Sequence, residues 1–313
     1  MIIIKNTEFA YAPKGYDLFI CTVSYEERSF YLLDNYREML TKTNSLVLST
    51  DNIGCFANAA RRYAELEETL DTQSFPYKGS TQGFLYTLRS KIEQIQKNKG
   101  AITICVDYSS MPRTWYCSIP ILLKDILRKT DVAYFWYAEG IYQGQQHQFP
   151  TAGTDAYNLF LGKPSLYAKD RTHVIGLGFD AIRTSGIIQK TDPDYLLLLK
   201  ANDKERADVL QKIDTANCEI IQRAARTTSL DISDFSFMLS KIREIVNERI
   251  QTDDVILIPD GPKPLVIAMS MVPLFIERTG ITCIHVARNM THFVPIKVTA
   301  STKVVGFSFT LED

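Results

Sequence analysis

The sequence predicts an α/β protein built of two tandem parallel-sheet domains that are related by internal duplication. Short apolar runs alternate with segments of helical spacing along the chain, which is the pattern of parallel strands covered by helices. The order of these segments begins again near the middle of the chain. The 313 residues are enough for two cores of about 150 residues each.

The first half is expected to alternate strands with helices. Apolar runs predict strands at 16–24, 44–50, 101–107 and 131–139. Apolar residues that recur every three or four positions predict helices at 25–40, 58–70, 83–97 and 114–129. Residues 140–165 gather Gly, Gln, Pro and Thr without periodicity, so we expect a loop that crosses between the halves. The first domain, with this crossing loop, is therefore expected at 1–165.

The second half is expected to repeat this order from residue 166 onward. A strand and then a helix are predicted within 173–190. Further strands are predicted at 195–203, 254–260 and 281–288, and further helices at 204–214, 235–250 and 263–280. The last residues, 289–313, alternate enough to predict a terminal β-hairpin. The second domain, with this hairpin, is therefore expected at 166–313.

Four landmarks recur in the same order in both halves, and they carry the case for a duplication. The pairs are Ser90-Lys91-Ile92 with Ser240-Lys241-Ile242, Asp107 with Asp260, Pro120 with Pro273, and Arg28 with Arg183. Their offsets are 150, 153, 153 and 155 residues. One such match would mean little, but four in order favour a tandem duplication over the alternative of a single large mixed sheet.

Composition excludes several classes of protein. With a net charge of -1 and a pI near 6.5, the chain has no basic field for a long nucleic acid duplex, although a small anion needs only a few local donors. The six cysteines form no CxxC pair and lie partly in apolar runs, as expected for reduced thiols of a cytoplasmic protein. Neither a secretory leader nor a membrane span is expected. The histidines His147, His173, His285 and His292 lack metal-ligand spacing, so no metal site is predicted.

Polar residues gather where the predicted strands end, and these are the candidate ligand-binding residues. They are Ser24 and Arg28; Asp107, Ser109, Ser110 and Arg113; Asp180 and Arg183; and Asp260, Gly261 and Lys263. The carboxyl ends of parallel strands share one edge of a sheet, where helix N-termini point unpaired N–H groups at a ligand. The sequence therefore predicts that these residues line one crevice.

A plainer role remains open for some of these residues. Asp107 and Asp260 follow strands, where an aspartate often caps the next helix or stabilises a turn. Arg113 and Lys263, however, place a cation in the first turn of a helix, where the helix dipole disfavours positive charge unless an anion is bound. Gly261 permits close backbone approach, and the prolines around Lys263 fix the loop, as suits a preformed anion site. Neither a Walker loop nor a complete dinucleotide fingerprint is present, so no cofactor is expected.

The motifs SYEER (24–28), DYSSMPR (107–113), FDAIR (179–183) and DGPKP (260–264) resemble those of a known family. They are similar to the CARF domain, a Rossmann-like sensor of cyclic oligonucleotides in prokaryotic antiviral defence, and to its fused tandem form, the SAVED domain. The resemblance implies two tandem Rossmann-like domains with the ligand in the crevice between the two copies. It places Ser24 and Asp180 at first-strand turns. The first copy departs from the family pattern, because serines and an arginine stand where the family has Gly, Thr and Lys.

The sequence thus leads to a nucleotide sensor or regulatory protein that acts through a separate effector protein. A second hypothesis is a metal-independent enzyme that cleaves a phosphodiester or glycosidic bond of a nucleotide, with Glu26 or Asp180 as the catalytic carboxylate. A pair of acids at a helix start also suits the helix dipole alone. A third hypothesis is a scaffold for assembly that binds no ligand. Turnover of a bound nucleotide separates the first two hypotheses, and lack of any ligand indicates the third.

Overall fold

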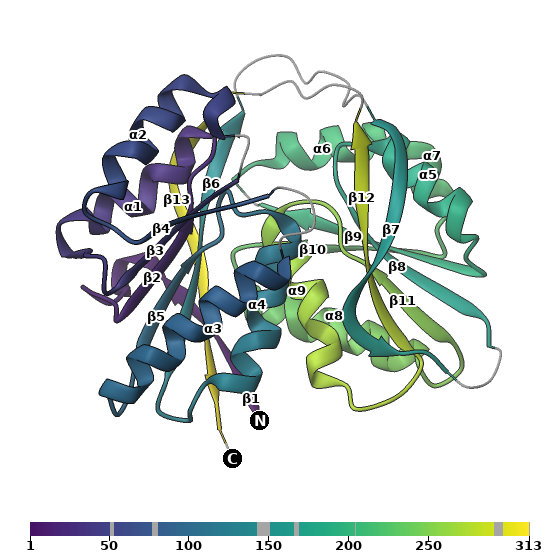
Figure 1. The fold of residues 1–313 in the computed structure, drawn as a ribbon. Helices are drawn as coiled ribbons and strands as arrows, with labels where there is room; N and C mark the ends of the chain where they lie inside the picture. Colours follow the sequence, from purple (N-terminus) through teal and green to yellow (C-terminus); the bar gives the residue numbers. More distant parts are fainter. Residues whose placement is uncertain are drawn as a thin grey trace. The chain divides into compact units, whose positions relative to one another are not determined.

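The computed structural model describes residues 1–50, 53–76, 81–142, 151–165, 169–203, 205–290 and 297–312 (Figure 1). The chain folds into two compact units. Unit 1 is formed by Met1–Gln145 together with Pro295–Asp313, and unit 2 is the continuous segment Gln146–Val294. Among the described helices, none combines the length and the apolar composition needed to cross a bilayer.

Unit 1 contains a seven-stranded mixed sheet in the order β1-β13-β6-β5-β2-β3-β4. Its strands are β1 Ile2–Glu8, β2 Leu18–Thr22, β3 Ser45–Thr50, β4 Thr72–Phe75, β5 Thr103–Asp107, β6 Val132–Tyr142 and β13 Val298–Leu311. The strands β2 to β6 are parallel, whereas β13 runs antiparallel to both β6 and β1. The interior strand β2 is buried along its length, so its continuous apolar sequence, LFICT, suits a strand covered on both faces.

Helices cover the sheet of unit 1. They are α1 Tyr31–Tyr36, α2 Ala57–Glu67, α3 Thr81–Asn98 and α4 Arg113–Ile126, with short 3₁₀ turns η1 Phe9–Tyr11, η2 Glu27–Phe30, η3 Arg37–Met39 and η4 Ile53–Cys55. Leu33 of α1 and Leu66 of α2 share a core with Phe19 and Cys21 of β2. The helices α3 and α4 pack on each other through the stacked rings of Phe84 and Trp115, whose centroids are 5.0 Å apart. The α/β class expected from the sequence is therefore confirmed.

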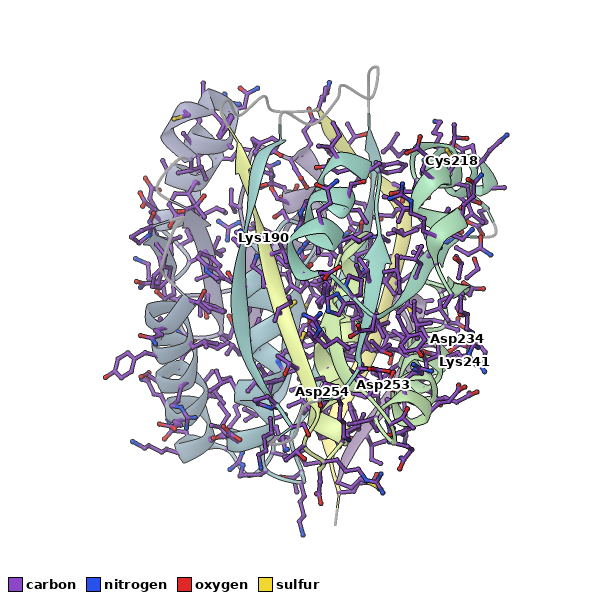
Figure 2. The ribbon with its side chains drawn as sticks, turned by 90° about the vertical axis from the view of Figure 1, so that its right-hand side faces the viewer. Lys190, Cys218, Asp234, Lys241, Asp253 and Asp254 are labelled. Carbon is purple, nitrogen blue, oxygen red and sulfur yellow. The ribbon has the colours of Figure 1, made fainter. Side chains whose placement is uncertain are left out.

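Unit 2 contains a six-stranded mixed sheet in the order β10-β9-β8-β11-β12-β7. Its strands are β7 Thr151–Lys163, β8 Arg171–Leu177, β9 Tyr195–Asn202, β10 Arg226–Asp231, β11 Asp254–Ile258 and β12 Ile281–Met290. Its helices are α5 Ala181–Thr191, α6 Ala207–Ala216, α7 Cys218–Arg223, α8 Phe235–Arg249 and α9 Lys263–Met271, followed by η5 Val272–Phe275. All strand pairs are parallel except that β7 runs antiparallel to β12. Figure 2 shows two polar residues of the α8 region, Asp234 and Lys241; Asp234 caps this helix by accepting a hydrogen bond from the N–H of Phe237 at 2.9 Å.

The parallel strands of the two units follow the same order. In unit 1 the order is β4-β3-β2-β5-β6, and in unit 2 it is β10-β9-β8-β11-β12. In each unit the first of these five strands along the chain, β2 or β8, lies in the middle of the five. The next two strands of the chain lie on one side of it, and the last two lie on the other side. The strand order therefore reverses between β2 and β5 in unit 1 and between β8 and β11 in unit 2. Ligands of open α/β sheets bind at the carboxyl ends of the strands at this switch point.

The predictions for the two connecting segments were wrong. Within the expected crossing loop, residues 151–163 form β7, while 143–150 and 166–168 lie outside the described residues. Within the expected terminal hairpin, residues 298–311 form the single strand β13, which pairs with β6 and β1 of unit 1. The units therefore divide elsewhere than at residue 165. The strands β7 and β13 form by backbone pairing with partners far along the chain, and local periodicity does not predict such pairing.

Candidate functional site

A buried ion pair marks the switch point of unit 2. Arg183, in the first turn of α5, donates a hydrogen bond from Nη1 to Oδ1 of Asp260 at 2.9 Å, and Asp260 follows β11. The other guanidinium nitrogen, Nη2, donates to the backbone carbonyl of Val286 on β12. Asp260 Oδ1 also accepts from the N–H of Gly261 at 2.8 Å. Arg183 thus links the helix after β8 to the loop after β11 and to β12.

Glycines allow the backbone segments at this point to touch. Gly261 has φ of +92°, and a Cβ at this position would lie 2.5 Å from the carbonyl oxygen of Leu177, the last residue of β8. A Cβ on Gly176 would lie 2.2 Å from the carbonyl oxygen of Asp260. Any larger residue would force β8 and the loop after β11 apart. The expected close approach at Gly261 is therefore present, and its partner is the neighbouring strand.

The helix α9 begins beside this contact without a side-chain cap. Pro262 is its N-cap residue, Lys263 is its first residue, and its first turn contains no acidic side chain. A cation at an uncapped N-terminus opposes the helix dipole. The prolines that fix the loop, Pro262 and Pro264, also lack backbone N–H groups, so this helix start offers fewer donors than an ordinary one. An anion held here would depend mainly on the Lys263 side chain.

Asp180 is a helix cap. Its Oδ1 accepts a hydrogen bond from the N–H of Arg183 at 3.0 Å, which satisfies one donor of the first turn of α5. Asn217, which is buried between α6 and α7, donates from Nδ2 to the carbonyl oxygen of Gly178 at 2.9 Å and so holds the turn between β8 and α5. The position proposed from the sequence for a catalytic carboxylate therefore carries a structural hydrogen bond.

In unit 1 a second buried arginine lies in the turn that follows β2. Arg28, in η2 after β2, is 2% exposed; its Nε lies 2.6 Å from Oε2 of Glu26, and its Nη1 donates to the hydroxyl of Tyr137 on β6 at 3.1 Å. Gly140 of β6 lies directly against this guanidinium, because a Cβ there would be 2.8 Å from Nη1. Ser24 Oγ accepts from the N–H of Glu26 at 3.2 Å. The first-strand turn is therefore a connected polar network.

The two serines of the next loop bind protein groups. Asp107 Oδ1 accepts from the N–H of Ser109 at 2.9 Å and also from its hydroxyl. The oxygen of that hydroxyl accepts from the N–H of Ala138 on β6 at 2.8 Å. Ser110 donates to the carbonyl oxygen of Thr22 at the end of β2. Asp107 therefore stabilises a turn rather than capping α4, whose N-cap residue is Pro112.

Arg113 is the first residue of α4 and forms a hydrogen bond with Tyr116 in the same helix. Burial raises the pKa of the Tyr116 hydroxyl well above its usual range, so this hydroxyl stays protonated. Burial, reinforced by the Asp107 carboxylate, likewise raises the pKa of the thiols of Cys21 and Cys105. Buried thiols of raised pKa are poor nucleophiles.

The described residues contain no group of three or more His, Cys, Asp or Glu side chains arranged to hold a metal ion. His173 is buried in β8 and hydrogen-bonds Thr191 through Nδ1, and burial lowers its pKa to about 4. His285 lies within β12. His147 and His292 lie outside the described residues.

The structure brings the nominated residues together within each unit. Asp180, Arg183, Asp260 and Gly261 form one network in unit 2, and Lys263 begins the adjoining helix. In unit 1 the residues Ser24, Glu26 and Arg28 form one network, and Asp107 with Ser109 forms another, both reaching the middle of β6. Tyr137, Val286 and Asn217 were missed. Nothing in the local sequence marks them, because their roles depend on which strand end faces the arginine or the glycine turn.

Comparison of the sequence with models of known protein families gives no match. No curated protein is significantly similar to it. Function is therefore inferred from the polar residues at the strand ends of the two units.

Proposed function

We propose that the chain is a nucleotide sensor that binds a phosphate-bearing ligand at the switch point of unit 2. One observation carries the proposal: Asp180, Arg183, Asp260, Gly261 and Lys263, chosen from the sequence, gather where the strand order of the sheet reverses between β8 and β11. In open α/β sheets this is the position at which ligands bind.

Within this site we assign different tasks to the residues. Lys263, the first residue of α9, supplies the positive charge for a phosphate. Arg183 and Asp260 bind each other and set the spacing of the strand ends, and Gly261 lets the loop approach β8. A site whose backbone is already fixed loses little entropy when a ligand binds.

One difference between the loops favours unit 2 over unit 1 as the binding unit. The loop after β5 in unit 1 carries Ser109 and Ser110, whose hydroxyls bind protein groups. The loop after β11 in unit 2 instead has Gly261, whose φ of +92° lets the backbone lie against the end of β8 and so fixes the loop before a ligand binds. We propose that the two units descend from an internal duplication, which their shared strand order and the four sequence landmarks support, and that unit 1 has lost the binding residues.

The class of ligand that we propose is a cyclic oligonucleotide, which the resemblance of the four motifs to CARF and SAVED domains supports. A sensor of this kind would pass its signal to a separate effector protein. The carboxylates considered for catalysis, Glu26 and Asp180, accept structural hydrogen bonds or ion pairs, which favours a binder over an enzyme.

The test is the thermal stability of the purified protein against mononucleotides, dinucleotide cofactors and cyclic oligonucleotides, with each ligand recovered afterwards. A ligand that binds only the folded state raises the midpoint, and the rise grows with the logarithm of the ligand concentration once that exceeds Kd. A raised midpoint with intact ligand supports the sensor, and a raised midpoint with degraded ligand indicates an enzyme. A midpoint that no nucleotide moves would contradict the proposal.

A further inference from the structure

Unit 2 is inserted into unit 1. Along the chain β6 is followed by unit 2, from β7 to β12, and only then by β13, which returns to the sheet of unit 1. Unit 2 is therefore continuous in sequence, whereas unit 1 is completed by the last residues of the chain.

The points at which the insertion leaves and rejoins unit 1 lie side by side. Tyr142 at the end of β6 pairs with Val298 at the start of β13, so a short hairpin turn could join them directly. The ends of unit 2 are also adjacent, because Thr151 at the start of β7 pairs with Met290 at the end of β12. Domains with adjacent ends are the ones that insert into another fold without disrupting it.

The strand β13 is part of the core of unit 1. Phe307 and Phe309 are fully buried, and the ring of Phe307 stacks on that of Phe135 in β6 with centroids 4.7 Å apart. Gly306 lies against the indole of Trp136, since a Cβ on this glycine would be 2.2 Å from the ring. Unit 1 thus depends on a strand that is attached to the rest of its chain through unit 2.

We infer that unit 2 acts as a folded clasp that stabilises unit 1. While unit 2 is folded, its paired ends hold β13 near β6. When unit 2 unfolds, β13 is joined to β6 only by a flexible chain, residues 143–297. The local concentration of a tethered segment falls with roughly the 3/2 power of the tether length, so a tether of about 150 residues lowers it about a hundredfold relative to a short hairpin.

The coupling is reciprocal, so folded unit 1 stabilises unit 2 by the same free energy. The six strands of unit 2, β7 to β12, all lie within one continuous segment, so unfolding of unit 1 removes none of them. Unfolding of unit 2 should therefore lower the stability of unit 1, and after unfolding of unit 1, unit 2 should lose the coupling but keep its own stability.

The tryptophans allow unit 1 to be followed alone in the full-length protein. The chain has two tryptophans, Trp115 and Trp136, and both are buried in unit 1. Their fluorescence during urea unfolding reports unit 1, while hydrogen exchange of peptides from α8 and β11 reports unit 2. Leu257→Ala removes a buried side chain of β11 and weakens unit 2, and Leu46→Ala does the same in β3 of unit 1.

Leu257→Ala should lower the urea midpoint of the tryptophan fluorescence. At a urea concentration that unfolds unit 1, unit 2 of Leu46→Ala should exchange its hydrogens at the wild-type rate. Ile182→Ala, on the exposed side of α5, is the control and should move neither reading. If Leu257→Ala does not fold, the milder Ile258→Val replaces it. A tryptophan midpoint that stays at the wild-type value while unit 2 unfolds early would overturn the inference.

A relinked chain that keeps all the strands of both units separates the clasp from ordinary contacts. In it a short turn joins residue 142 to residue 298, and residues 151–290 follow residue 313 through a flexible linker. Leu257→Ala should leave the tryptophan midpoint of this chain unchanged, and an equal shift in both chains would overturn the clasp. One consequence rests on the proposed function: a nucleotide bound to unit 2 should raise the tryptophan midpoint of unit 1. Failure of that step alone would count against the ligand, because the Leu257→Ala comparison needs none.

Discussion

Arg183 and Asp260 form an ion pair of 2.9 Å, buried between the helix that follows β8 and the loop that follows β11. Removing one member of a buried pair leaves the other charge without compensation, which typically costs about 3–5 kcal/mol. We therefore expect Arg183→Ala to lower the free energy of unfolding by about that amount, measured with urea. The double variant Arg183→Met with Asp260→Leu should be less destabilised, because it removes both charges.

The matched control for this pair is Arg171→Ala. Arg171 lies 3.5 Å from Asp194, with both side chains about half exposed, and exposed pairs contribute about 0–1 kcal/mol. Equal losses for Arg183→Ala and Arg171→Ala would show that the buried pair does not organise the switch point.

Gly261→Ala should destabilise unit 2 through the backbone. The position requires a φ of +92°, and the added Cβ would lie 2.5 Å from the carbonyl oxygen of Leu177. We expect a loss of about 1–3 kcal/mol, from strain and from the displaced loop. Gly100→Ala, where a Cβ would meet nothing within 4 Å, serves as the control in the same unfolding measurement. An unchanged stability of Gly261→Ala would refute the close contact between β8 and this loop.

His173 should make stability depend on pH. Burial, with Arg171 nearby, lowers its pKa in the folded protein to about 4, against 6.5 in the unfolded chain. Between pH 4 and pH 6.5 the unfolded state binds more protons than the folded state. The stabilisation that comes from keeping His173 neutral is therefore complete above about pH 6.5 and is lost as the pH falls towards 4. The total loss should reach about 3 kcal/mol.

His173→Gln tests this by removing the titrating group. Its free energy of unfolding should vary less than that of the wild type between pH 6.5 and pH 4, whatever the absolute stability of the variant. Parallel pH profiles for the two proteins would rule out His173 as the source.

Ser109→Ala should destabilise unit 1, because its hydroxyl joins Asp107 to the N–H of Ala138 on β6. Loss of the hydroxyl removes the acceptor of the buried Ala138 N–H and should cost about 1–3 kcal/mol. Asp231 and Ser233 form the same turn at an exposed position, with Asp231 Oδ1 accepting from the Ser233 N–H at 2.9 Å. Ser233→Ala is therefore the matched control and should change unfolding by less than about 0.5 kcal/mol. The reverse order of losses would contradict the role given to Ser109.

Apolar runs predicted the strands β2, β3, β5, β6, β8, β9, β11 and β12, because these are covered by helices and need continuous apolar sequence. Strands β1, β4, β7 and β10 were missed, and β13 was expected only as part of a hairpin. Strands β4 and β10 are polar strands at a sheet edge, and β1, β7 and β13 owe their places to partners far along the chain. The insertion of unit 2 is therefore invisible to periodicity.

For the candidate site, too, the sequence predicted some features and not others. The rule that parallel strands end at one edge was enough to gather Arg183, Asp260 and Gly261 in advance. That Arg183 binds Asp260, while Arg28 binds Glu26 and Tyr137, depends on side-chain directions that the sequence does not reveal. The same lack of directional information hid the fact that Ser109 and Ser110 bind protein groups.

The most direct measurement is the affinity of cyclic oligonucleotides for the wild type and for Lys263→Ala by titration calorimetry. Loss of one charge-assisted contact of about 1.5–3 kcal/mol should weaken binding by about one to two powers of ten. Lys241→Ala removes a lysine of α8 (Figure 2) that pairs with Glu244, and this variant should bind as the wild type does. Equal affinity of Lys263→Ala and the wild type, or no heat from any nucleotide, would contradict a nucleotide site at the switch point of unit 2.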